Sequence, residues 1–192
     1  MKFKSKEEIT NKIGELHSNG FDRIHLPGGT SIDGNFYSGV VVADYDEETK
    51  EIYFLGVPYC SSFHFKGEGG HNKKTGETPE TAAVRELLEE TGIQIKKDSL
   101  DLVFEKDILD NRSGRVGKFH TKYFYLVTKF TGNLFTFEGE NPMDGETAAP
   151  IWIPASLFVK VVFGGHLTAV NSAIKNLCMQ DRKYAYALMN LL

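Results

Sequence analysis

The chain has 192 residues, of which 41% are hydrophobic and 25% charged, and its formal net charge is -4. This length fits one compact domain with a substantial core, and the composition excludes a disordered chain. The acidic balance disfavours a protein that binds nucleic acid broadly, because contact with many phosphates requires a basic excess.

The cysteines and the N-terminus indicate a reducing compartment. Cys60 and Cys178 are the only cysteines and match no metal or redox spacing, so we expect free thiols, although the fold could still pair them. The opening residues MKFKSKEEIT lack the apolar run of a signal peptide, and no stretch is long enough to span a bilayer. These features predict a cytoplasmic protein with no membrane partner.

The N-terminal part of the chain predicts a helix and then a hairpin. A capping-box pattern at Ser5 and apolar residues at helical spacing predict a short helix over residues 5–19. The ranges 36–45 and 51–57 are rich in Val, Ile, Tyr and Phe, and a charged link separates them. We therefore expect two antiparallel strands.

A second helix is predicted in the middle of the chain. Thr78 is placed as an N-cap, with Pro79 at the first helical position, and the helix is expected to continue to about Thr91. Gly92 is placed to end it. The residues compatible with a buried face are Ala82, Ala83, Val84, Leu87 and Leu88.

The rest of the chain predicts further strands and two C-terminal helices. The expected strands are Asp101 to Leu109, Phe119 to Lys129, Asn133 to Phe137 and Ala148 to Ile153. Apolar residues at helical spacing from Leu167 to Leu177 predict a helix, and Asp181 could cap a last one. We expect one domain over 1–192, an α+β sandwich with a mixed sheet and helical additions at about 5–19 and 166–191.

Three glutamates in the middle helix form a candidate metal site. Glu86, Glu89 and Glu90 stand at relative positions 0, +3 and +4, so their carboxylates share one helix face and repel one another. A divalent cation would relieve this repulsion, and Mg²⁺ prefers oxygen ligands. The alternative is an ordinary solvated acidic face, as most such faces are.

The surrounding sequence resembles a known motif. The segment from Gly70 to Ile93, GHNKKTGETPETAAVRELLEETGI, is similar to the box of the Nudix hydrolase family, G-x5-E-x7-R-E-U-x-E-E-x-G-U with U aliphatic. From Glu77 to Ile93 every specified position matches. Gly70 lies seven residues before Glu77 instead of six, and His71 occupies the expected position, which a one-residue insertion explains.

The resemblance implies a fold, a reaction and a cofactor. Nudix enzymes fold as an α/β/α sandwich and hydrolyse a nucleoside diphosphate linked to another moiety, by attack of water at phosphorus with Mg²⁺ or Mn²⁺. The implied metal ligands are Glu86, Glu89, Glu90 and, subject to the insertion, Gly70. The implied catalytic residues include Arg85, Glu89 and Glu90. Arg85 would pair with Glu77, although a surface pair with Glu89 is the alternative.

Two loops supply further hypotheses. Arg112, Arg115 and Lys118 lie between predicted strands and could bind substrate phosphate, or form a solvated hairpin tip. In many Nudix enzymes a glutamate on a late loop activates the water, and Glu146 is the candidate here, unless a glutamate of the box serves. The aromatic residues Phe63, Phe65, Phe135, Phe137 and Trp152 are mostly expected in the core, and His71 is expected to be solvated.

The substrate stays open between nucleoside triphosphates, nucleotide sugars and dinucleotides, because no accessory motif for a particular substrate is present. A small-molecule nucleotide is the expected partner, and a homodimer is one option for the oligomeric state. A different class of function is a catalytically idle Nudix domain that binds a nucleotide as a sensor or interaction module. A third is an unrelated α+β binding domain with an acidic helix.

Overall fold

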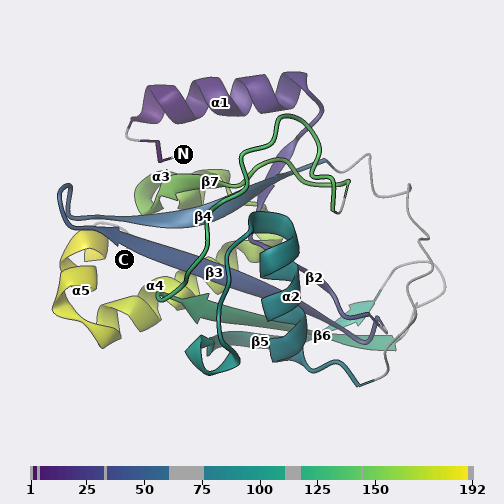
Figure 1. Cartoon of the computed structure of the whole chain (residues 1–192). Helices are drawn as coiled ribbons and strands as arrows, with labels where there is room; N and C mark the ends of the chain where they lie inside the picture. The colour runs from purple at the N-terminus through teal and green to yellow at the C-terminus, as the bar shows by residue number, and fades with distance from the viewer. Residues whose placement is uncertain are drawn as a thin grey trace.

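The structure is a computed structural model, and it describes residues 2–3, 5–32, 34–60, 76–110, 118–143 and 145–189. Within these residues a mixed sheet is flanked by helices (Figure 1). The elements are α1 (Lys6–Ser18), β1 (Arg23–His25), β2 (Gly28–Thr30), β3 (Phe36–Asp46), β4 (Glu51–Tyr59), α2 (Pro79–Thr91), η1 (Lys97–Ser99), β5 (Asp101–Asp110), β6 (Lys118–Val127), β7 (Ile151–Pro154), α3 (Ala155–Val161), η2 (Gly164–His166), α4 (Leu167–Gln180) and α5 (Arg182–Leu188).

The sheet has the order β1-β4-β3-β6-β5, with β2 paired to β3 and β7 paired to β4. β3 and β6 run parallel, in register from Phe36 opposite Thr121 to Val42 opposite Val127. The other described strand pairs are antiparallel, including the predicted hairpin of β3 and β4. The mixed sheet expected from the sequence is therefore confirmed.

Alternating residues of β3 divide the core between the two faces of the sheet. Val40 and Val42 pack with Ala83 and Leu87 of α2 in one cluster. Val41 belongs to a second cluster, to which helices α1, α3, α4 and α5 contribute. Because successive strand residues point to opposite faces, one strand supports both layers. The predicted α/β/α sandwich is confirmed, with α2 covering one face.

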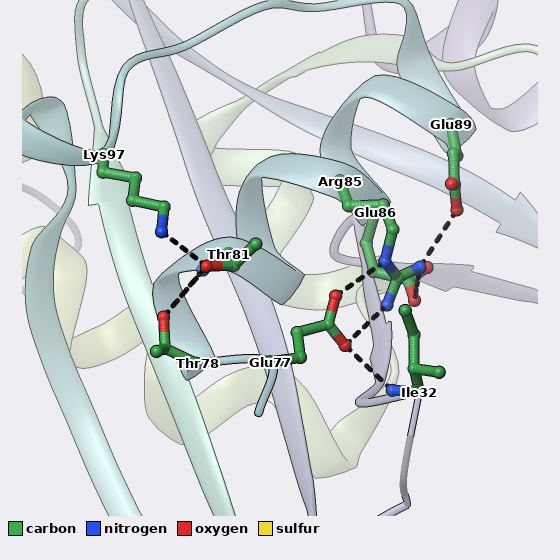
Figure 2. Close-up of polar contacts among 8 residues, drawn as sticks. All are labelled: Ile32, Glu77, Thr78, Thr81, Arg85, Glu86, Glu89 and Lys97. Atoms are coloured by element: carbon green, nitrogen blue, oxygen red, sulfur yellow. Dashed lines mark hydrogen bonds and ion pairs between the residues drawn. The ribbon is translucent and has the colours of Figure 1, made fainter. Parts of the chain in front are cut away.

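Both ends of α2 form as its sequence predicts. The Thr78 side chain accepts a hydrogen bond from the Thr81 backbone N–H (Figure 2). Pro79 occupies the first turn. Gly92 ends the helix in the left-handed conformation, with φ of 80°, and its N–H donates to the Leu88 carbonyl. A glycine adopts this φ without steric cost, so the helix ends directly after the acidic residues.

Two expectations for this region are wrong. Residues 133–137 form no strand, because the Phe135 N–H donates at 3.0 Å to the carbonyl of Thr91, at the end of α2. Phe135 and Phe137 are accordingly half-buried, whereas Trp152 lies in the core. Leu88, expected on the buried face of the helix, is 40% exposed.

Some of the other expectations concern residues that the structure describes, and some concern residues outside them. The predicted C-terminal helices are present as α4 and α5, and the Asp181 side chain caps α5 by accepting from the Lys183 N–H. Cys60 and Cys178 form no disulfide in the described part of the chain. Phe63, Phe65 and His71 lie outside it. A search of the described helices finds none with the length and apolar character to cross a membrane.

The buried His166 and the partly buried His25 connect the C-terminal elements to the start of the sheet. The Nδ1 atom of His166 accepts a hydrogen bond of 3.1 Å from the Leu26 N–H, and its ring packs against the edge of the His25 ring. Burial lowers the pKa of His166 to about 3 and that of His25 to about 4. Both rings are therefore neutral at physiological pH.

We predict that the free energy of unfolding decreases as the pH falls from about 6.5 towards 4. In this window the unfolded chain binds protons at His25 and His166 that the folded protein excludes, so acid favours unfolding, by on the order of 2 kcal/mol per histidine at pH 5. His166→Asn retains an acceptor for Leu26 and should reduce this dependence. Urea unfolding at pH 7 and pH 5 measures it, with His17→Asn on exposed α1 as the control. Equal pH dependence of wild type and His166→Asn would contradict the prediction.

Candidate active site

Two acidic residues of α2, Glu86 and Glu90, lie against the glycines of β2, which runs beside the helix (Figure 1). The Gly28 N–H donates a hydrogen bond of 2.8 Å to Oε2 of Glu90. The Glu86 carboxyl lies so close to Gly29 that a Cβ atom at residue 29 would be 2.5 Å from it. The absence of a side chain at Gly29 therefore leaves room for the Glu86 carboxylate beside the backbone of β2.

Arg85 joins three carboxylates on the same side of the helix (Figure 2). Its Nε and Nη2 atoms donate to the two oxygens of Glu77, at 2.9 and 3.2 Å. Its Nη1 atom donates to Glu86 at 2.7 Å and to Glu89 at 3.1 Å. The predicted pair with Glu77 is confirmed, and the pair with Glu89 that was its alternative is also present.

Glu77 connects the helix to the segment that follows β2. Its side chain is 5% exposed, and its Oε2 atom accepts a hydrogen bond of 2.8 Å from the Ile32 N–H (Figure 2). Glu77 thus contacts Arg85 on α2 and the backbone of the β2 segment at once. A buried carboxylate with these partners holds the two segments together.

The environment of Glu86 differs from that of a carboxylate on a solvated helix face. Its side chain is only 15% exposed. Burial is the main cause that raises the pKa of Glu86 to about 7; Arg85 opposes this shift, and the neighbouring Glu89 and Glu77 add to it. Most acidic helical residues are well hydrated, so the alternative of an ordinary solvated face does not describe Glu86.

The donor atoms suit a hard divalent cation, but the side chains do not form a ready ligand cage. Within the described residues, no three His, Cys, Asp or Glu side chains gather closely enough to hold a metal ion by themselves. Glu86 and Glu89 instead share the guanidinium of Arg85. A cation would satisfy the buried charge of Glu86, and carboxylate oxygens are ligands that Mg²⁺ and Mn²⁺ prefer. The chemistry of the residues therefore fits such an ion.

The loop that carries Glu146 is attached to the C-terminal end of α2. Asn141 is fully buried, and its Nδ2 atom donates at 3.0 Å to the carbonyl oxygen of Glu89. Glu146 is half-buried, and its carbonyl accepts from the Cys60 N–H. Burial and a hydrogen bond to the Glu146 carboxylate raise the pKa of Tyr59 to about 12, so the phenol is protonated. The predicted base is thus anchored beside the sheet.

Part of the predicted site belongs to segments that the structure does not describe. Gly70, Arg112 and Arg115 lie outside the described residues, as does the side chain of Lys118. Conversely, the sequence patterns did not single out Gly28, Gly29 or Asn141. The two consecutive glycines after Pro27 could have indicated a place where another group approaches the backbone closely. No local sequence pattern indicates a role for Asn141.

Comparison with known proteins shows the family. The family model for the NUDIX domain matches residues 40–164, more than half of the chain, so the chain belongs to the Nudix family. A comparison with curated protein sequences gives no match.

Solved structures with a similar fold are distant in sequence. A MutT/nudix family protein from Enterococcus faecalis is 14% identical, with a TM-score of 0.52 over 97% of this chain and 81% of that chain. The NUDIX domain of Shewanella oneidensis NrtR, complexed with ADP ribose, is 14% identical, with a TM-score of 0.50 over 72% of this chain and 84% of that chain. At this identity the likeness shows the fold alone.

We predict that Arg85→Lys lowers the free energy of unfolding by about 1–3 kcal/mol, because an ammonium group cannot donate to three carboxylates in the planar geometry of a guanidinium. Urea denaturation measures the change. The control is Lys50→Gln, which removes the exposed partner of Glu47 and should cost less than about 1 kcal/mol. Equal effects of the two substitutions would show that the Arg85 contacts are no stronger than a surface ion pair.

Proposed function

We propose that this protein is a metal-dependent Nudix hydrolase that cleaves a phosphoanhydride in a nucleoside-diphosphate-linked substrate by attack of water at phosphorus. The observation that supports it most is the burial of the Glu86 carboxylate against Gly29, next to Glu90, on the helix that carries the Nudix box. Arg85 offsets part of the cost of this buried negative charge, and a divalent cation would offset more of it. A site that binds a divalent ion and a phosphate would account for the buried Glu86 carboxylate next to Glu90.

In this proposal Glu86, Glu89 and Glu90 hold Mg²⁺ or Mn²⁺, with the Gly70 carbonyl as a further ligand. The ion would neutralise charge on the phosphate oxygens and lower the pKa of water. Arg85 acts as a positioning residue, because its guanidinium holds Glu86 and Glu89 relative to Glu77. Glu89 and Glu90 are the proposed catalytic carboxylates.

Two further roles rest on the loops. Glu146 is proposed as the general base, because its loop is attached to α2 through Asn141. Arg112, Arg115 and Lys118 are proposed to bind substrate phosphate. For the domain organisation we propose one unit over residues 1–192, because α1, α4 and α5, which lie outside the range matched by the family model, bury residues in the same core cluster as the sheet.

The substrate class is tested with a panel of nucleotides and the purified wild-type protein, with Mg²⁺ and with Mn²⁺. The panel contains nucleoside triphosphates, nucleotide sugars and dinucleotides, and also ADP-ribose, which occupies the structurally similar NUDIX domain from Shewanella oneidensis. Hydrolysis is followed as phosphate released by a phosphatase that acts on the products alone. Metal-dependent turnover of one class supports the proposal. Nucleotide binding without turnover would support the idle domain instead.

We predict that Glu90→Gln reduces kcat by several orders of magnitude but leaves the fold intact. The amide oxygen of glutamine can still accept the hydrogen bond from Gly28, while the metal loses a charged ligand. The measurements are kcat at saturating Mg²⁺ and thermal melting with and without metal.

The matched control is Glu7→Gln, an equivalent substitution on the exposed face of α1, which should leave both quantities unchanged. An ordinary acidic helix face would give the opposite result, namely a small gain in stability from reduced repulsion. Near wild-type turnover of Glu90→Gln, with an unchanged shift of melting temperature on adding metal, would remove Glu90 from the site.

We predict that Glu146→Gln lowers kcat by ~10²–10⁴, the usual contribution of a positioned general base. Tyr59 can still donate to the glutamine oxygen, so the loop should keep its place and KM should change little. Steady-state kinetics on the best substrate of the panel, together with the melting temperature, measure both effects. An undiminished kcat would assign the base to another residue, such as a glutamate of the box.

A further inference from the structure

The short strand β2 lies before the range matched by the family model, yet it contacts the acidic residues of α2. Residue 29 has no room for a side chain on its helix-facing side, since an added Cβ would be 2.5 to 2.6 Å from the carboxyl carbon and both oxygens of Glu86. These are the closest atoms to that position, and they belong to the end of a flexible side chain. An alanine here would therefore displace the Glu86 carboxylate with little demand on the backbone.

Gly28 is constrained differently from Gly29. Its φ of 147° is rarely adopted by residues with a side chain, and an added Cβ would overlap the Ser38 carbonyl oxygen. Substitution at residue 28 would therefore disturb the pairing of β2 with β3. A substitution at Gly29 can therefore displace the Glu86 carboxylate without disturbing the pairing of β2 with β3.

The backbone of β2 and of the segment before it is also held by two side chains, Tyr37 on the paired strand β3 and His166 near the C-terminal part of the chain. The Tyr37 hydroxyl donates at 3.2 Å to the carbonyl oxygen of Gly28, while the Gly28 N–H donates to Glu90. Burial, together with the charges of Glu90 and Glu86, raises the pKa of Tyr37 well above its ordinary value, so the hydroxyl keeps its proton. The Nδ1 atom of His166 accepts from Leu26, just before β2. The strand is thus held as a fixed surface.

We propose that β2 is a positioning element of the metal site, and that Gly29 determines metal affinity by leaving the space in which the Glu86 carboxylate lies. This inference rests on the proposed function. The helix supplies the carboxylates, and the strand sets where two of them can point. Metal ligands need support of this kind, because loss of a residue that orients a ligand typically weakens binding by about 10–100-fold.

The experiment compares Mn²⁺ binding by the whole chain and by Gly29→Ala, measured by calorimetry and by the electron paramagnetic resonance signal of free Mn²⁺. We expect the affinity of Gly29→Ala to fall about tenfold or more. The matched control is Gly14→Ala, where an added Cβ meets no atom within 4 Å, and it should bind as wild type does. Melting of the metal-free proteins checks that the fold persists.

A double-substitution cycle with Glu86→Asp tests whether Gly29 acts through Glu86. Aspartate is one methylene shorter, so its carboxylate does not reach the space that the added methyl group would fill, and Gly29→Ala should cost little affinity in that background. Additive losses of affinity would overturn the proposal. If Gly29→Ala does not fold, the double variant should, and its failure to fold would show that Gly29 serves the fold instead.

The two proposals fail in different ways. A wild-type chain that binds no Mn²⁺ overturns the proposed function and the role of β2 with it. Wild type and Gly29→Ala that bind Mn²⁺ equally overturn only the role of Gly29. In that case the proposed roles of Glu90 and Glu146 are unaffected.

Discussion

The contact of the Arg85 guanidinium with Glu77, Glu86 and Glu89 is the interaction on which the described part of the site depends. Three carboxylates on one side of a helix repel one another, and burial makes that repulsion stronger because less water screens it. One planar cation with several N–H donors offsets much of this cost. It does so while fixing the directions in which the carboxylates point, and a mobile lysine could not do this as well.

The contact also explains why Glu77 must stand before the helix. From that position the Glu77 carboxylate accepts hydrogen bonds from the Arg85 side chain and from the Ile32 backbone N–H. Glu77 therefore connects α2 to the segment after β2. At the opposite end of the helix, the Glu89 carbonyl accepts from Asn141 and the Thr91 carbonyl from Phe135. The helix is thus attached at both ends to segments distant in the sequence, which limits how far its carboxylates can move.

The sequence predicted those features of the site that are set by local spacing. Thr78, Pro79 and Gly92 define the limits of α2 through interactions within a few residues, and the Glu77–Arg85 pair follows from the motif. The segment 133–137 was misassigned because its alternating apolar residues fit a strand, while its backbone bonds go to α2. No local pattern could have shown that pairing. The same limit applies to Asn141, whose partner Glu89 is 52 positions away.

The residues of the candidate site come from two separate parts of the sequence, the helix α2 and the strand β2. The carboxylates belong to a motif recognisable from sequence, but the surface against which Glu86 and Glu90 rest comes from residues before the family-matched range. The carboxylates and part of the surface that positions them thus come from separate segments of the chain. A substitution in β2 or in Tyr37, which holds its backbone, can change the geometry of the carboxylates without changing the motif. In the proposed site, the motif supplies the carboxylate oxygens that would bind a cation, while Arg85 and β2 together set the directions of Glu86 and Glu90.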